Sequence, residues 1–212
     1  MENLKDIRSE YEENTLDETT ANRDPFLQFE KWFADALQTG LPHPNAFVLS
    51  TSTSKGKPSA RVVLLKGIDP DGFVFYTNYD SRKANEIEEN AIAAMTFFWS
   101  KPERQIRIEG VLKKVSAAES DEYFKSRPRG SQAGAWVSPQ SKVIPGREAL
   151  DVSHEWFLKE NESKDIMRPP FWGGYRLYPS RIEFWQGRTN RLHDRILYSL
   201  ENDEWKIERL AP

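Results

Sequence analysis

Short β-type runs separated by turn residues fill the chain from residue 46 onward, and no other feature restricts the fold as much. The runs are rich in branched and aromatic residues and read, in order, AFVLSTST, ARVVLLKGI, GFVFYTN, AIAAMTFFW, RQIRIEGVLKKV, YRLYPSRIEFWQ, RLHDRILYSL and EWKIERL. The turn residues DPDG predict a hairpin between the second and third runs. In the fifth run, Ile106 and Ile108 alternate with polar neighbours, as in a strand with one buried face. About eight antiparallel strands in one chain favour a barrel or a sandwich closed on itself.

Helices are predicted at four places. After Asp24 and Pro25, aromatic residues recur at helical spacing as far as Leu37, which predicts an amphipathic helix whose aromatic stripe packs into the core. The other three helices are predicted in SRKANEIEENA, in SAAESDEYFKSR, where a capping box pairs Ser116 with Glu119, and in GREALDVSHEWFLKEN. The sequence has no internal repeat and no sharp linker. We therefore expect a single domain over residues 25–212, mainly β with helices (α+β), after a flexible N-terminal arm at residues 1–24.

The composition excludes several classes of site and partner. Lys and Arg number 30 against 33 Asp and Glu, and the net charge of −3 provides no overall positive field for nucleic acid or an anionic membrane, so any anion site is local. The absence of cysteine excludes disulfides and thiolate zinc sites, and the three histidines are too far apart in the sequence to predict a metal site. No apolar run approaches the roughly 20 residues that span a bilayer, and the charged start is unlike a signal peptide. We therefore expect a soluble, cytoplasmic protein.

Two cationic clusters lie in the first half of the β region. Strand alternation places Arg61 and Lys66 on opposite faces, each among aliphatic residues, where an isolated cation is costly to desolvate and so indicates a bound anion. A charge at a strand end that reaches solvent is the alternative. Arg82 and Lys83 stand where a helix begins, and the unpaired N–H groups of a first turn also favour an anion such as phosphate. The alternative there is a solvated helix start.

Two further clusters lie in the second half. Tyr123, Arg127 and Ser131 fall within nine residues and combine groups that grip phosphate, although the segment also suits a helix followed by a polar loop. In the run EFWQGRTNRLHDR, the residues GRTN predict a turn. Alternation along the next strand then places Arg191, His193 and Arg195 on one face with no acid on that face, so that they repel one another unless an electron-rich group lies above them. A solvated outer face is the alternative.

Taken in order, these segments resemble a known family. RVVLLK, YTN, SRKA, RQIRIEG, YFKSRPRGSQAGAWVSPQS, FWGGYRL, EFWQG, RLHDR and the final ERLAP together resemble the pyridoxamine 5′-phosphate oxidases, flavin enzymes of vitamin B6 metabolism. The resemblance extends from about Arg8 to Pro212 and is most specific in RLHDR and ERLAP. It implies an FMN-binding split β-barrel that forms a homodimer, with FMN in clefts at the subunit interface and both chains contributing to each site.

The resemblance also implies which residues bind FMN. Arg61, Arg82, Lys83 and Ser141 suit its phosphate, while Gln105, Trp185 and Arg195 suit the edge of the isoalloxazine ring, where hydrogen bonds and positive charge stabilise the reduced flavin. The complete set of implied FMN contacts is Arg61, Val62, Val63, Leu64, Tyr76, Thr77, Arg82, Lys83, Gln105, Gln140, Ser141, Trp185 and Arg195.

The implied reaction is the oxidation of pyridoxamine or pyridoxine 5′-phosphate to pyridoxal 5′-phosphate, with O2 reduced to H2O2. The resemblance implies that the substrate phosphate is bound by Lys66, Tyr123, Arg127 and Ser131, and that the pyridine ring is contacted by Arg191 and His193. We hypothesise that the last two orient the ring and balance its charge as the catalytic pair. Arg8 and Tyr11 match an N-terminal lid that contacts substrate, whereas His43 stands where relatives often carry an acid, so any role of that acid is not expected here.

Two other interpretations remain open at the level of the sequence. Related split barrels serve other oxidoreductases, so the same flavin barrel with a different reductant is one alternative. A non-catalytic protein that binds and delivers FMN or pyridoxal 5′-phosphate is the other. The presence of all six implied substrate contacts between Lys66 and His193 favours the oxidase.

Overall fold

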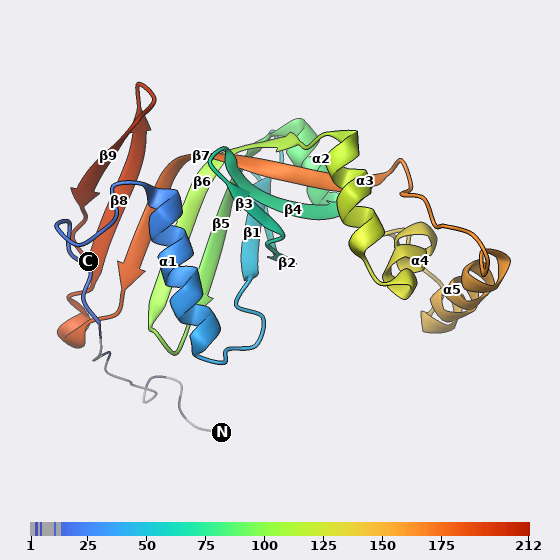
Figure 1. The fold of residues 1–212 in the computed structure, drawn as a ribbon, viewed down its shortest axis with the longest axis horizontal. Helices are drawn as coiled ribbons and strands as arrows, with labels where there is room; N and C mark the ends of the chain where they lie inside the picture. Colours follow the sequence, from blue (N-terminus) through green and yellow to red (C-terminus); the bar gives the residue numbers. More distant parts are fainter. Residues whose placement is uncertain (1–2, 4, 6–10, 12–13) are drawn as a thin grey trace.

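The computed structural model describes residues 3, 5, 11 and 14–212. Its centre is one antiparallel sheet in the order β2-β1-β5-β6-β7-β4-β3, with β8 paired to β7 and β9 paired to β8 (Figure 1). The mainly β fold with helices (α+β) is confirmed. The sheet curls into a half-barrel whose edge strands, each paired on one side only, are β2, β3 and β9. The strands are β1 (Ala46–Ser52), β2 (Pro58–Leu64), β3 (Gly67–Asp69), β4 (Gly72–Asn78), β5 (Ile92–Trp99), β6 (Arg104–Lys114), β7 (Trp172–Gln186), β8 (Asp194–Glu201) and β9 (Glu204–Arg209).

The run ARVVLLKGI forms two strands instead of one. β2 pairs with β1 as far as Leu64, after which the Leu65 amide donates to Asn45 and the Lys66 amide donates to Val74 on β4. The chain thus changes partners at Leu65, and only the short β3 makes the predicted hairpin with β4. The predicted alternation from Arg61 to Lys66 is confirmed by exposure, because every second residue from Arg61 is buried or half-buried and those between are exposed, although Lys66 itself lies between β2 and β3.

β7 is the longest strand and joins the two ends of the sheet. Its first half pairs with β4, its second half pairs with β8, and β6 pairs along most of its length. The register between β6 and β7 shifts at Glu109 and Gly110, opposite Pro179, which has no amide hydrogen to donate. A Cβ on Gly110 would lie 2.1 Å from the Tyr178 carbonyl oxygen, so only glycine fits this close approach.

All four predicted helices are present, and α4 adds a fifth. The helices are α1 (Pro25–Gln38), α2 (Arg82–Glu89), α3 (Ala117–Ser126), α4 (Arg129–Val137) and α5 (Arg147–Glu160). Asp24 caps α1 by accepting from the Phe26 amide, and Ser116 caps α3 by accepting from the Glu119 amide. The reciprocal half of the predicted capping box is absent, because the Glu119 carboxylate accepts from Arg176. The loop expected after Arg127 is wrong, since α4 begins directly after Pro128.

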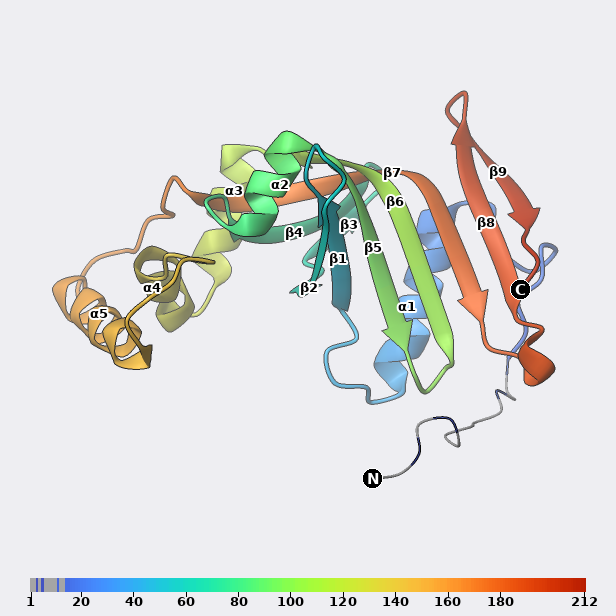
Figure 2. The same cartoon turned by 180° about the vertical axis from the view of Figure 1, so that it is seen from behind.

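The core has two parts. Phe29 of α1 packs on aromatic residues of β4 and β5, and Trp32 packs on Phe184 of β7, all on one face of the sheet. A smaller cluster under α3 and α4 contains Phe124, Ile166 and Trp172. The face of β1, β5, β6 and β7 opposite α1 is not covered by a helix (Figure 2). None of the helices in the described part of the chain is long and apolar enough to cross a membrane.

The described part of the N-terminal arm contacts β8 and β9. Leu16 is buried in the core, and its amide donates to the Asp194 carboxylate at 3.1 Å. Arg209 donates to Glu18 at 2.7 Å, and the Tyr198 hydroxyl donates to the Asn22 carbonyl at 2.6 Å. These contacts fix the path of residues 14–24, while the flexibility of the arm stays a prediction.

Candidate active site

A buried carboxylate brings together Arg61 and Arg82, which belong to two separate cationic clusters of the sequence. Glu86 of α2, 4% exposed, accepts from Arg61 at 3.1 Å and from Arg82 at 2.9 Å. It also accepts from the hydroxyls of Thr51, at 2.6 Å, and Ser59. Burial acts to raise the pKa of Glu86, but these hydrogen bonds and the charge of Arg61 outweigh it and lower the pKa to about 2. The interpretation of Arg61 as an unpaired cation is therefore wrong. For Arg82, the spacing from Glu86 of one helical turn is a sequence signal that predicts the ion pair.

Lys83 joins this cluster from the next position of α2. Its ammonium donates to Gln140 at 2.7 Å, to Thr77 at 3.0 Å and to Ser81 at 3.1 Å. The Arg82 amide donates to the Ser141 hydroxyl at 3.2 Å. Burial, followed by repulsion from Arg61, lowers the pKa of Lys83 to about 8, while Glu86 opposes the shift. The residues assigned to the flavin phosphate thus lie together, although they are distant in the sequence.

A cleft of about 610 Å³ lies beside this cluster and contains all four residues assigned to the substrate phosphate. It is lined by Leu64, Lys66, Tyr76, Thr77, Tyr123, Ser126, Arg127, Pro128, Ser131, Gln140 and Trp172. Tyr76 and Tyr123 stack with ring centroids 3.9 Å apart, and Trp172 lies parallel to both. Thr77 and Gln140, which also contact Lys83, connect the cleft to the cation cluster.

Arg127 is the cation in this cleft that most clearly lacks an anion. Its guanidinium carbon lies 4.6 Å from the centre of the Trp172 ring. Its Nη1 is buried and has no hydrogen-bond partner in the part of the chain that the structure describes. Burial lowers the pKa of the guanidinium. Because an unsatisfied buried donor is costly, this atom marks a place where an anionic ligand fits.

The residues assigned to the pyridine ring lie on a turn and not on a strand. Thr189–Arg191 form a 3₁₀ helix, η2, with φ of 60° at Arg191, and β8 begins only at Asp194. The expected strand face of Arg191, His193 and Arg195 is therefore wrong. His193 packs on Trp185 with centroids 4.6 Å apart, and its Nδ1 accepts from the Arg188 amide at 3.1 Å. Burial, followed by the charge of Arg191, lowers the pKa of His193.

Tyr11 of the predicted lid lies against the same turn. Its ring is 5.7 Å from Trp185 and 5.6 Å from His193, both in edge contact. A Cβ on Gly187 would lie 2.8 Å from the Tyr11 ring. Arg8, the other lid residue, lies outside the described residues.

Arg195 has an acidic partner that the sequence analysis did not identify. Glu183 of β7 is buried and accepts from Arg195 at 2.8 Å and from Arg107 at 3.2 Å. Arg195 also donates to the Ala211 carbonyl at 2.7 Å. Glu183, on the neighbouring strand, thus offsets the repulsion among these cations. The sequence did not reveal this contact, because Glu183 belongs to a different β-type run from the cations.

The uncovered sheet face connects an apolar patch with the residues assigned to the flavin ring. Phe98, Gln105, Trp185 and Arg195 are successive cross-strand partners on β5, β6, β7 and β8. Val48 and Val62 are likewise partners on β1 and β2. Val62 and Phe98 are 68% and 60% exposed, although both are large and apolar. This face is the one that no helix covers in Figure 2.

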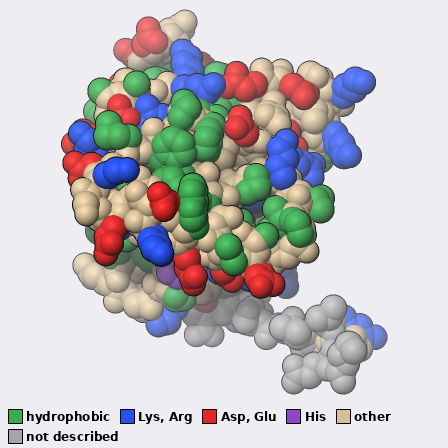
Figure 3. Space-filling model, turned by 90° about the vertical axis from the view of Figure 1, so that its right-hand side faces the viewer, with side chains coloured by type: hydrophobic (Ala, Val, Ile, Leu, Met, Phe, Trp, Pro, Cys, Tyr) green, Lys and Arg blue, Asp and Glu red, His purple; other side chains and the backbone are tan. Residues whose placement is uncertain are grey.

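The two groups of site residues lie at opposite ends of the molecule. The cleft is formed around α3 and α4, whereas η2 and the start of β8 lie at the other end of the sheet (Figure 1). On the end that carries α4 and α5, Lys and Arg are mixed with Asp and Glu around apolar side chains (Figure 3). The concentrations of positive charge described above are therefore local.

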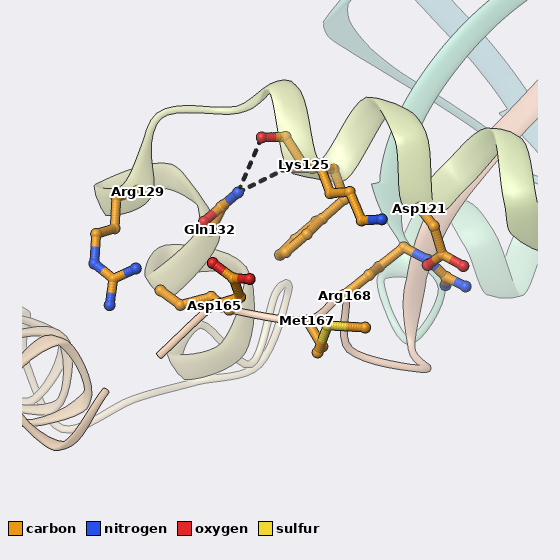
Figure 4. Close-up of a pocket in the computed structure, with 9 residues that line it drawn as sticks. Asp121, Lys125, Arg129, Gln132, Asp165, Met167 and Arg168 are labelled. Atoms are coloured by element: carbon orange, nitrogen blue, oxygen red, sulfur yellow. Dashed lines mark hydrogen bonds and ion pairs between the residues drawn. The ribbon is translucent and has the colours of Figure 1, made fainter. Parts of the chain in front are cut away.

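A separate hollow of about 460 Å³ lies between α3, α4 and residues 165–168 (Figure 4). It contains none of the residues singled out from the sequence. Asp121 and Arg168 pair at 2.7 Å, and the Gln132 amide donates to the Phe124 carbonyl at 3.0 Å. Because these polar groups bond to one another, they do not indicate a ligand in the way that the unpartnered Nη1 of Arg127 does in the cleft.

Two family models match the chain. Residues 33–159 match the model described as pyridoxamine 5′-phosphate oxidase, and residues 172–212 match the C-terminal dimerisation region of pyridoxine 5′-phosphate oxidase. A pyridoxine/pyridoxamine 5′-phosphate oxidase of Nostoc punctiforme is 53% identical over 210 residues, which cover 99% of this chain and 98% of the relative.

The chain belongs to the pyridoxamine 5′-phosphate oxidase family. This is a family of oxidoreductases, and the resemblance seen in the sequence is confirmed. Its two matches also divide the site: the cation cluster and all of the cleft except Trp172 fall in the first, whereas Trp185, Arg191, His193 and Arg195 fall in the dimerisation region.

Two solved structures share the fold of this family. PhzG from Burkholderia lata 383, in complex with tetrahydrophenazine-1-carboxylic acid, has a TM-score of 0.88 at 31% identity, covering 94% of this chain and 98% of PhzG. A pyridoxamine 5′-phosphate oxidase-related, FMN-binding protein from Nostoc punctiforme has a TM-score of 0.70 at 21% identity, covering 87% and 97%. The predicted fold class is thus confirmed by family and by structure.

Proposed function

We propose that this protein oxidises pyridoxamine and pyridoxine 5′-phosphate to pyridoxal 5′-phosphate, with FMN as cofactor and O2 as the electron acceptor that yields H2O2. The observation that carries the proposal is the buried, unpartnered Nη1 of Arg127 in a cleft that also contains Lys66, Tyr123 and Ser131. A phosphate monoester supplies the missing acceptor and balances two cations. Aromatic rings line the same cleft and suit a planar substrate.

The residues present fit FMN. Arg61, Arg82, Lys83 and Ser141 would hold its phosphate at the start of α2, where helix N–H groups add further donors. When bound, FMN supplies a flavin that accepts a hydride from C4′ of the substrate and returns its electrons to O2. Gln105, Trp185 and Arg195 would border the flavin ring, and the remaining contacts assigned to FMN are Val62, Val63, Leu64, Tyr76, Thr77 and Gln140.

A homodimer completes this proposal. The turn that carries Arg191 and His193 lies at the opposite end of the molecule from the cleft, so one chain does not bring them together (Figure 1). A second copy placed on the uncovered face would bury Val48, Val62 and Phe98 and bring its own turn toward the cleft. The match of β7 to β9 to a dimerisation region supports this arrangement.

In this arrangement Arg191 and His193 orient the substrate ring. A lowered pKa keeps His193 neutral near pH 7, and its Nδ1 accepts from the Arg188 amide, so its proton is on Nε2. His193 then offers a hydrogen-bond donor without adding charge, while Arg191 supplies the charge. Holding the ring flat against the flavin places C4′ in position for transfer.

Oxygen uptake tests the proposal. Protein loaded with FMN is expected to consume O2 and form H2O2 and pyridoxal 5′-phosphate when either phosphorylated vitamer is added, and to remain inactive with unphosphorylated pyridoxine. Turnover of tetrahydrophenazine-1-carboxylic acid, the ligand in the PhzG structure, without turnover of either phosphate would contradict it. Binding of FMN without any oxygen uptake would instead support a carrier protein.

A further inference from the structure

We propose that Glu86 is a positioning residue that holds Arg61 and Arg82 in the orientation needed for the flavin phosphate, and so makes the site select FMN over riboflavin. This inference rests on the proposed function, because it takes FMN as the cofactor. Glu86 was not among the residues that the sequence assigned to any ligand, and its own oxygens already accept hydrogen bonds from protein groups.

The two carboxylate oxygens serve different elements. Oε2 accepts from Thr51 on β1 and from Ser59 and Arg61 on β2, whereas Oε1 accepts from Arg82 at the start of α2. Thr51 and Ser59 are themselves cross-strand partners. Glu86 therefore connects the helix that begins at the phosphate site with the edge of the sheet, and the relative placement of the two arginines depends on the length of this one side chain.

Arg61 is fixed by contacts on both terminal nitrogens. Nη1 donates to the Leu49 carbonyl at 3.0 Å and to Thr51 at 2.6 Å, while Nη2 donates to Ser59 and to Glu86. Such a guanidinium has a single orientation. Its charge is thus presented to a ligand from a fixed position, without the entropic cost of ordering a free side chain.

Arg82 is held differently. Glu86 binds only its Nε, and neither terminal nitrogen has a hydrogen-bond partner among the residues that the structure describes. The side chain is 59% exposed. An arginine that is anchored at Nε and free at its end presents two parallel N–H groups, the arrangement that binds two oxygens of one phosphate. Without the anchor, this exposed side chain would sample many rotamers.

The charges agree with this role. Arg61, Arg82 and Lys83 contribute three positive charges and Glu86 one negative charge, which leaves two. A phosphate monoester carries about −1.5 to −2 near pH 7, so cluster and ligand neutralise each other. Glu86 also allows the three cations to lie together before any ligand is bound, because it offsets their mutual repulsion.

Substitution of Glu86 by aspartate separates orientation from charge. Glu86→Asp keeps the charge but shortens the side chain by one methylene, so that it no longer reaches Arg61 and Arg82 together. We expect the affinity for FMN to fall by at least about tenfold, as for the loss of one charge-assisted bidentate contact. The affinity for riboflavin, which has the same ring but no phosphate, should stay within about twofold. Both are measured by quenching of flavin fluorescence.

Three comparisons complete the design. Glu89→Asp is the matched control, since Glu89 is an exposed carboxylate on the same helix that contacts Ser54 and neither arginine, and it should bind both flavins like the wild type. Glu86→Gln, which cannot accept on both sides, should show the same selective loss. Thr51→Val removes the hydroxyl that contacts both Glu86 and Arg61, so a smaller selective loss is expected even if the Glu86 variants do not fold.

The outcomes are distinct. An equal loss of FMN and riboflavin affinity in Glu86→Asp, or no loss of either, would overturn the role of Glu86. If Thr51→Val leaves the preference for FMN unchanged, that also contradicts the inference. A wild-type protein that binds FMN no better than riboflavin would instead contradict FMN as the cofactor, whatever the variants do.

Discussion

Arg127 is the residue whose environment most directly calls for a ligand. Its buried, unpartnered nitrogen and its contact with Trp172 leave a charge that the protein itself does not neutralise. We expect Arg127→Ala to raise the KM for pyridoxine 5′-phosphate by about 100-fold, since hydrogen bonds to a charged group contribute about 1.5–3 kcal/mol. Steady-state kinetics measure this effect.

The control for Arg127 is two residues away. Arg129→Ala removes an exposed arginine that donates to the Lys164 and Asn161 carbonyls outside the cleft, so KM should change little. The affinity for FMN should be unaffected in both variants. Equal KM values in Arg127→Ala and the wild type would refute the assignment of the substrate phosphate to this cleft.

We expect Lys83 to make the affinity for FMN depend on pH. Burial and the charge of Arg61 on β2 lower its pKa to about 8 in the absence of ligand, with Glu86 of α2 acting in the opposite direction. Lys83 is therefore charged below pH 8 and loses its charge above it. Because a phosphate stabilises the charged form, affinity should be level below about pH 8 and fall by up to about tenfold per pH unit above it.

Fluorescence titrations of FMN across this range test the prediction for Lys83. Lys83→Arg, whose guanidinium stays charged throughout, should remove the decline above pH 8. A wild-type profile that stays level from pH 7 to pH 10 would show that Lys83 does not contact the phosphate.

At the same scale, the cations could be predicted from the sequence but their counter-ions could not. Arg61 was singled out as a charge among apolar residues, Lys83 as a cation at a helix start, and Arg127 as part of a set that suits phosphate. Glu86 and Glu183 were not, because the geometry that buries them comes from α2 folding onto β1 and β2 and from β7 pairing with β8. Such contacts between elements leave no periodic signal in the chain.

At the scale of elements, the pattern of short β-type runs predicted the sheet, and most strands and helices were correctly anticipated. The errors occur where the chain changes partners or direction. β2 and β3 appeared as one run because hydrophobic alternation does not show that the chain leaves the side of β1 after Leu65 and bonds to β4 from Lys66 onward. α4 was missed because Gly130 and Gly134 weaken its helical propensity, although Pro128 just before it is a common helix start.

The two glycines at positions 110 and 134 should respond oppositely to alanine. A Cβ at Gly110 would clash with the Tyr178 carbonyl across the β-bulge, so Gly110→Ala should lower the free energy of unfolding by about 3 kcal/mol, the upper range for overpacking. A Cβ at Gly134 of α4 meets no atom within 4 Å, so Gly134→Ala should raise it by about 0.5–1 kcal/mol. Urea unfolding of the two proteins measures both values, and a stable Gly110→Ala would contradict the close approach of β6 and β7.

At the scale of the whole molecule, β7 sets the separation of the two groups of site residues. Trp172, near its start, lines the cleft, and Trp185, near its end, packs on His193. Thirteen residue steps of about 3.3 Å give roughly 40 Å along the strand, far more than one substrate can bridge. These residues belong to one site only by family resemblance, because neither periodicity nor spacing in the sequence predicts which residues a second chain would supply.

Mixed dimers test whether each site takes residues from both chains. Arg127→Ala and Arg191→Ala homodimers should both be poorly active. When the two are unfolded, mixed and refolded together, half of the dimers are heterodimers with one intact site, so about a quarter of wild-type activity should return. If both residues of a site came from the same chain, no intact site would form and activity would not recover.

The continuity of β7 has a mechanical consequence for such a dimer. Each β7 strand would contribute to both active sites of the dimer, with one end of the strand in each site. The distance between the two active sites would then be set by the continuous backbone of β7 and its hydrogen bonds to β6, and not by the packing between the subunits. Weakening of the subunit interface would open both active sites together, while the length of each β7 strand would stay the same.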